Sequence, residues 1–193
     1  HGRYLAAGAQ VSTTASYQAS RDGFGSTGMS PEAADRLIGD SVRLARQAQD
    51  SLTSQAPTWV AASVGPYGAA LADGSEYRGD YGVTARTLHD FHARRLEVLA
   101  AAGPDVLAVE TIPDVREAEV LVPLLDDLAI DAWFSYAVAD GRTRAGQSLD
   151  EAFAVVARSR SVIAAGVNCC APDEVLDALL AARAAGVAAG VAY

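Results

Sequence analysis

The only two cysteines of this 193-residue chain, Cys169 and Cys170, are adjacent. They come just after the apolar run at 161–167 and just before a stretch with helical character. A thiol at the carboxyl end of a parallel strand lies where an α/β barrel keeps its reactive groups. Such a thiol can act as a nucleophile, bind a soft metal ion, or pack as a small buried apolar side chain.

A metal ligand explains Cys169 better than a nucleophile does. A nucleophile needs a neighbouring base, but His1 is terminal and His89 and His92 fall inside a predicted helix. We expect these two to share one helix face and to be solvated or helix-stabilising. Zinc takes about four ligands, of which about three come from protein in catalytic sites. Because neighbouring strand residues point opposite ways, the pair supplies one ligand, and the others must come from outside the segment.

Polar side chains also gather where the other predicted strands end, and in a parallel barrel all these ends face one side. Glu110 follows an apolar run, so its carboxylate could hold a substrate ammonium group or act as a general base. The alternatives are a solvated loop acid or a partner for a nearby arginine. The strand-end residues are Thr13, Thr14, Ser16, Tyr17, Tyr67, Glu110, Thr111, Ser135, Tyr136, Asn168 and Cys169.

Short apolar runs alternate with amphipathic stretches along the whole chain, a pattern that predicts parallel βαβ units. A long loop at 65–82 is a candidate functional segment. Its Tyr77, Asp80 and Tyr81 could form part of a lid, but we favour a solvated surface loop for them. Strands are predicted at 9–15, 59–64, 106–110, 132–138, 161–168 and 187–191, and helices at 31–52, 84–102, 114–128, 148–159 and 172–185.

Six strands allow an open doubly wound sheet or an incomplete barrel. The first eight residues resemble the last turns of a helix, and Tyr193 directly follows a predicted strand. We therefore expect one domain, 1–193, that is part of a (β/α)8 TIM barrel. About six βα units are present, and the first and last are absent.

Composition excludes several classes of function. A net charge of −9 argues against a nucleic-acid surface. The chain contains no lysine, which excludes Schiff-base chemistry within it. No apolar run approaches the ~18 residues of a membrane span. The lack of a signal peptide and the two reduced cysteines favour a cytoplasmic protein.

Five segments of the chain form an ordered set of motifs. They are TTASYQA at 13–19, SVGPYG at 63–68, GSEYRGDY at 74–81, ETIP at 110–113 and GVNC at 166–169. In this order they resemble the homocysteine S-methyltransferase family, and most closely the bacterial branch that uses S-methylmethionine or S-adenosylmethionine. The resemblance implies a catalytic zinc held by three cysteines, of which Cys169 is the first. The other two belong to a Gly-Gly-Cys-Cys motif that this sequence lacks, as it lacks the family's opening Asp-Gly-Gly.

By the same resemblance, Glu110 should bind the homocysteine ammonium and Thr13 should line the amino-acid pocket. Asn168 should shape the metal strand, and Tyr17 should lie near the donor methyl. The product would be methionine. The alternatives are a relative that methylates another thiol or a selenol, one that uses betaine or a corrinoid donor, or a truncated non-catalytic binding or scaffold protein.

Overall fold

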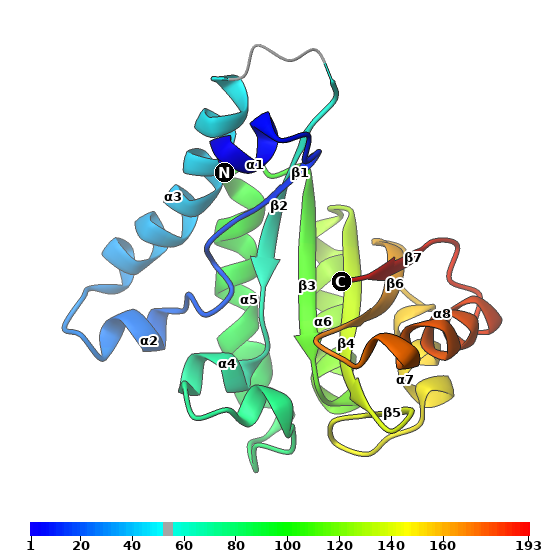
Figure 1. Ribbon diagram of the computed structural model, residues 1–193. Coiled ribbons are helices and arrows are strands. Elements are labelled where there is room, and N and C mark those ends of the chain that lie inside the picture. The colour runs from blue at the N-terminus through cyan, green and yellow to red at the C-terminus, as the bar shows by residue number, and fades with distance from the viewer. Residues whose placement is uncertain (52–55) are drawn as a thin grey trace.

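The core of the protein is a parallel sheet that curls around one face. A computed structural model describes residues 1–51 and 56–193. The parallel strands follow each other in the order β1-β2-β3-β4-β6-β7, and a two-residue β5 pairs antiparallel with β4. Figure 1 shows β1 and β7 as the two edge strands. The strands are β1 Val11–Thr13, β2 Trp59–Val64, β3 Val106–Ile112, β4 Ala132–Ala139, β5 Arg142–Thr143, β6 Val162–Asn168 and β7 Gly190–Ala192.

Helices alternate with these strands, which confirms the predicted α/β fold as an incomplete (β/α) barrel. The first long helix starts where the sequence predicts it, because Pro31 occupies its first turn and Ser30 Oγ accepts a hydrogen bond from the Ala33 N–H. Its predicted end at Leu52 lies outside the described residues. The helices between strands are α3 Pro31–Asp50, α5 Ala85–Ala101, α6 Val115–Leu128, α7 Leu149–Val156 and α8 Val175–Ala184, and a short α1 spans Gly2–Ala6.

The two faces of the sheet differ in what covers them. Alternate strand residues, such as Leu107 and Val109, join a large apolar cluster with the helices. The residues between them point to the other face, where Ala61, Val106 and Ala108 form a small second cluster. That inner face becomes polar toward the carboxyl ends of the strands, because Ser63 and Glu110 follow these residues at the same spacing of two.

The loops contain more structure than the sequence predicts. A helix α2 (Arg21–Gly25), with Ser20 as its N-cap, lies between β1 and α3. The predicted loop at 65–82 contains helix α4 (Tyr67–Leu71) and the 3-10 turn η1 (Ser75–Tyr77). The predicted helix at 172–185 is divided into a 3-10 turn η2 (Pro172–Glu174) and α8. Glycines inside or beside α2, α4 and η1 hide their helical character, since glycine is a poor helix former.

None of the described helices combines the length and apolar character that a membrane-spanning helix requires.

Candidate active site at the carboxyl ends of the strands

Cys169 lies at the end of β6 beside two polar side chains that link this strand to β3. The Thr111 N–H donates to Asn168 Oδ1 at 2.8 Å, and Asn168 Nδ2 donates to Thr111 Oγ1 at 2.7 Å. Asn168 Nδ2 is also 3.5 Å from Cys169 Sγ, and Thr111 Oγ1 is 3.9 Å from that sulfur. Cys169 is exposed, so its thiol is accessible from the open end of the sheet.

The backbone around this thiol is held in an uncommon conformation. Cys169 has φ 52° and Thr111 has φ 63°, both in the left-handed region. For a β-branched residue such as threonine this conformation is a clear outlier. It costs on the order of 1–3 kcal/mol, which surrounding contacts must offset. The reciprocal bonds between Asn168 and Thr111 supply such contacts. Positions of this kind concentrate at functional sites.

Glu110 is a buried carboxylate with hydroxyl partners only. Its side chain is 8% exposed. Ser63 Oγ donates to one carboxylate oxygen, and the Tyr193 hydroxyl donates to the other at 2.7 Å. No arginine or histidine of residues 1–51 and 56–193 lies within ion-pair distance of it. The alternatives of a solvated acid or an arginine partner are therefore wrong, and the carboxylate has no charge partner.

The segment after β1 is tied to β2 through hydroxyl groups. Thr14 Oγ1 and Ser16 Oγ are 2.7 Å apart, and Ser16 Oγ donates to the Ser63 carbonyl at 2.7 Å. The Ser63 N–H donates to Thr14 Oγ1 at 3.0 Å. Thr13 is exposed and pairs in register with Ala61, so it lies on the inner face, where a pocket-lining residue must be.

Two tyrosines from different loops lie near the thiol. The Tyr17 phenol interacts with the Thr111 side chain, and burial raises its pKa. The Tyr77 phenol interacts electrostatically with Cys169, and this interaction is the main cause that raises the pKa of Tyr77. Tyr77 was expected to be solvated, and it is indeed half-exposed, but it also belongs to the site. The glycine-rich segment 74–81 was the available signal for it.

Tyr193 is another site residue that the sequence does not indicate. Besides donating to Glu110, its hydroxyl accepts a hydrogen bond from Trp133 Nε1 at 3.1 Å and lies 3.4 Å from Ser135 Oγ. Ser135 is thereby placed at the site, as its strand-end position predicted. These contacts link Glu110 on β3 to the first half of β4 and to the residue that follows β7.

Two predicted strand-end positions are corrected. The Tyr136 hydroxyl donates to the Ala152 carbonyl on the helix-covered face, away from the site. The Tyr67 ring packs on Tyr81 and Phe91 rather than facing the thiol. Both follow from geometry, because alternate strand residues point to opposite faces and Tyr67 already belongs to α4.

The predicted solvation of His92 is also wrong, whereas His89 is exposed as expected. His92 is fully buried, and its Nε2 lies 2.8 Å from Glu117 Oε1. Glu117 also accepts hydrogen bonds from the Tyr67 N–H at 2.6 Å and from the Tyr81 hydroxyl at 3.1 Å. Burial lowers the pKa of His92. This buried group secures the 65–82 loop to α5 and α6, so Tyr81 is not a solvated residue.

The described part of the chain does not group three or more His, Cys, Asp or Glu side chains as a metal ion requires. Cys169 is exposed and borders Asn168 and Thr111, so it can serve as one ligand of a soft metal ion. Cys170 is partly buried against the apolar core, and burial raises the pKa of its thiol. It is the poorer ligand of the two.

The family model described as homocysteine S-methyltransferase matches residues 1–193. This chain belongs to that family. It is 46% identical over 197 residues to homocysteine S-methyltransferase 2 of Zea mays, a match that covers 95% of the chain and 58% of the relative. It is 42% identical over 189 residues to selenocysteine Se-methyltransferase of Brassica oleracea var. italica, covering 89% of the chain and 55% of that protein. The chain thus spans a little under three fifths of the length of these curated relatives.

Solved structures of a family member agree in fold. The metallated form of the homocysteine methyltransferase MmuM from Escherichia coli superposes with a TM-score of 0.94 at 41% identity, covering 100% of this chain and 69% of MmuM. The apo form gives a TM-score of 0.80 at 32% identity. The likeness confirms the incomplete barrel, since the chain corresponds to about two thirds of the MmuM structure.

Proposed function

We propose that the protein transfers a methyl group from a sulfonium donor to the thiol of homocysteine, forming methionine. The donor would be S-methylmethionine or S-adenosylmethionine, and residues 1–193 would be part of the homocysteine-binding barrel domain. The observation that carries the proposal is the presence of two groups at the carboxyl ends of the strands. They are the accessible thiol of Cys169 and the buried carboxylate of Glu110, which has no charge partner among the described residues.

Glu110 would bind the ammonium group of homocysteine. A buried carboxylate with only hydroxyl donors is stabilised when a cation arrives, because the attraction between the two charges is strong at a site shielded from water. Ser63 and Tyr193 donate to the carboxylate and so fix the direction in which its remaining lone pairs point. Thr13, on the inner face of β1, would line the same pocket.

Cys169 would be one ligand of a zinc ion. When bound, zinc stabilises a coordinated thiolate and thereby lowers the pKa of a substrate thiol. The chain offers one of the roughly three protein ligands that such a site needs, so the others would come from beyond residues 1–193. Asn168, whose amide nitrogen lies 3.5 Å from Cys169 Sγ, would orient that ligand.

The tyrosines beside Cys169 would hold the sulfonium donor. Tyr17 and Tyr77 come from two different loops and both interact electrostatically with Cys169, and the faces of aromatic rings attract cations. Methyl transfer releases an uncharged thioether, so it requires little acid-base catalysis. A rim built of hydroxyl and amide groups suits a reaction that depends on positioning.

A selenol is the second candidate acceptor. The observation that favours it is the 42% identity to a protein named selenocysteine Se-methyltransferase. A selenol and a thiol differ little in shape, so the Glu110 ammonium site would serve both. A betaine donor, and a binding protein without turnover, are distinguished by the experiment below.

The test is a methyl-transfer assay on the purified, zinc-loaded intact gene product. Homocysteine is supplied with S-methylmethionine, S-adenosylmethionine or betaine, each carrying a deuterated methyl group, and labelled methionine is measured by mass spectrometry. We expect label transfer from one or both sulfonium donors. Transfer from betaine alone, or homocysteine binding without any transfer, would overturn the proposal. A parallel reaction with selenocysteine separates the two acceptors.

A further inference from the structure

Arg95 is a buried arginine that contacts neither the thiol nor Glu110. It lies on α5 with a side chain that is 2% exposed. Its Nη1 donates to the Gly65 carbonyl at 3.1 Å, and its Nη2 donates to the carbonyls of Tyr17 at 3.0 Å and Ser16 at 3.4 Å. One guanidinium therefore binds the backbone of two loops, those that follow β1 and β2.

The charge of Arg95 has no acidic partner within ion-pair distance among the described residues. The Phe91 ring covers the guanidinium, with its centroid 5.1 Å from Cζ, and Arg95 Nε lacks a hydrogen-bond partner in the described structure. Burial lowers the pKa of Arg95 to about 10. Burying a charge in this way is costly, so a stability role alone does not explain why an arginine is used here.

The two loops that Arg95 joins are in close contact. The Gly65 N–H donates to the Tyr17 carbonyl at 3.2 Å. A Cβ atom on residue 65 would lie 2.6 Å from the Tyr17 ring and from its carbonyl oxygen. Glycine is therefore required at position 65, and the Tyr17 ring rests on its Cα. Arg95 and Gly65 both hold the Tyr17 backbone, and the Tyr17 phenol interacts with the Thr111 side chain. Any shift of these loops therefore moves a phenol near the Cys169 site.

We propose that Arg95 is a positioning residue for Tyr17. Its planar fork of donors fixes three carbonyl oxygens at once, which an ammonium group cannot reproduce. It thereby holds the phenol of Tyr17 beside Thr111 and Cys169. The expected effect of Arg95 on kcat rests on the proposed methyl transfer, whereas its role in holding the two loops does not.

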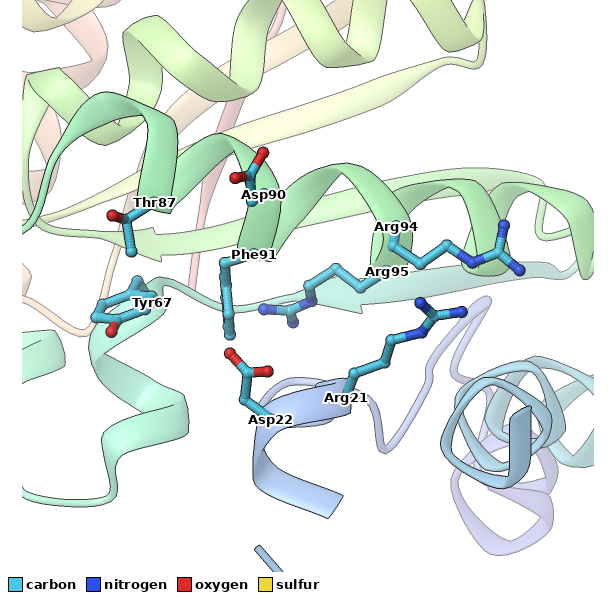
Figure 2. A pocket seen from close by; sticks show the side chains of 8 residues that line it. All are labelled: Arg21, Asp22, Tyr67, Thr87, Asp90, Phe91, Arg94 and Arg95. Atoms are coloured by element: carbon cyan, nitrogen blue, oxygen red, sulfur yellow. The ribbon is translucent and has the colours of Figure 1, made fainter. Parts of the chain in front are cut away.

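A ligand site at Arg95 is the weaker explanation. A cavity of about 330 Å³ lies between α2, α4 and α5, and Arg95 forms part of its wall. Figure 2 shows Arg94 and Arg21 extending away from Arg95. Both guanidinium groups already have an acidic partner, since each donates to the Asp35 carboxylate. Arg95 Nη1 and Nη2 donate to backbone carbonyls, and its Nε is buried away from solvent, so these three arginines offer a ligand in the cavity no unoccupied cationic group.

The test compares Arg95→Lys, which keeps the charge, with the control Arg94→Lys on the same helix, both in the zinc-loaded intact gene product. We expect Arg95→Lys to lower kcat for methyl transfer by roughly tenfold to a hundredfold, with the homocysteine KM within about twofold of wild type. Arg94→Lys should leave both constants unchanged. In a Tyr17→Phe background, Arg95→Lys should have a much smaller effect on kcat, because both changes remove the same interaction. Equal losses in the two backgrounds would overturn the proposal.

A second measurement needs no activity. Hydrogen–deuterium exchange should show faster exchange at the Gly65 amide in Arg95→Lys, with the core strand β3 still protected. Unchanged exchange at Gly65 would refute the proposed clamp. If wild type transfers no methyl group, the proposed function fails, and the exchange data still decide the role of Arg95.

Discussion

Asn168 and Thr111 exchange two hydrogen bonds across the end of β4, which lies between their strands. Removing the amide in Asn168→Ala leaves the Thr111 N–H buried without an acceptor, which costs about 1–3 kcal/mol. We expect urea unfolding to show that loss. Zinc affinity should also fall, by roughly tenfold or more, in an equilibrium competition with a chelator. A variant with normal zinc affinity would show that Asn168 does not orient Cys169.

The two cysteines should differ in what they do. Cys169→Ala should lose most bound zinc and most methyl transfer, because it removes an accessible ligand from the rim of the sheet. Cys170→Ala should keep most of both, because its side chain packs against the core. Metal content by atomic emission and the labelled-methyl assay measure the two effects. Equal losses in both variants would mean that the wrong thiol has been assigned.

Replacing glycine with alanine should lower stability at position 65 and raise it at position 39. Gly65→Ala places a Cβ within 2.6 Å of Tyr17, and overpacking of this kind costs about 1–3 kcal/mol. Gly39 lies inside α3, where a Cβ would make ordinary contacts at 3.9 Å with Ala102. Gly39→Ala should therefore stabilise the protein by about 0.5–1 kcal/mol. Thermal unfolding of both variants measures the contrast, and destabilisation by Gly39→Ala would contradict the packing of α3.

Asp35 should make stability depend on acid pH. Hydrogen bonds from Arg21 and then Arg94 hold the pKa of this carboxyl at about 2, below its ordinary value. A depressed pKa contributes stability that is present above the ordinary pKa of about 3.9 and is lost as pH falls toward 2. Asp35→Asn should therefore cost about 1–2 kcal/mol at pH 7, allowing for partial exposure.

Urea unfolding of the Asp35→Asn variant between about pH 7 and pH 2.5 tests this. The difference from wild type should shrink as pH falls. The matched control is Asp22→Asn on the exposed side of α2, which should change stability by less than about 0.5 kcal/mol. A difference for Asp35→Asn that stays constant with pH would show that the carboxylate charge is not its source.

Glu117 should be among the most sensitive positions outside the site. Glu117→Ala leaves three donors, on His92, Tyr67 and Tyr81, without an acceptor in a buried region. We expect a loss of about 3 kcal/mol or more. Glu119→Ala, on the exposed side of the same helix, should cost less than about 0.5 kcal/mol. Similar losses in the two variants, measured by urea unfolding, would contradict the buried network.

The sequence predicts the strands and long helices because their apolar spacing is regular. The strand-end positions of Cys169, Asn168 and Glu110 are predicted for the same reason, since each comes at the end of such a run. Tyr193 reaches the site through chain geometry that no local spacing encodes, and only the long glycine-containing loop around Tyr77 indicates that residue. His92 and Arg95 were missed because polar residues on a helix usually face water. Yet Leu88, His92, Arg95, Leu96 and Leu99 follow the spacing of a single buried helix face. This spacing was the sequence signal that His92 and Arg95 are buried.

The order of the main strands in space is their order along the chain, apart from the short β5 hairpin. Each new strand pairs with the one made before it, so no strand has to be inserted between two that are already joined. A chain emerging from the ribosome can therefore extend its sheet one βα unit at a time, with each partner edge already in place. Strand β3, which carries Glu110, would therefore join the sheet before β6, the strand that ends next to Cys169.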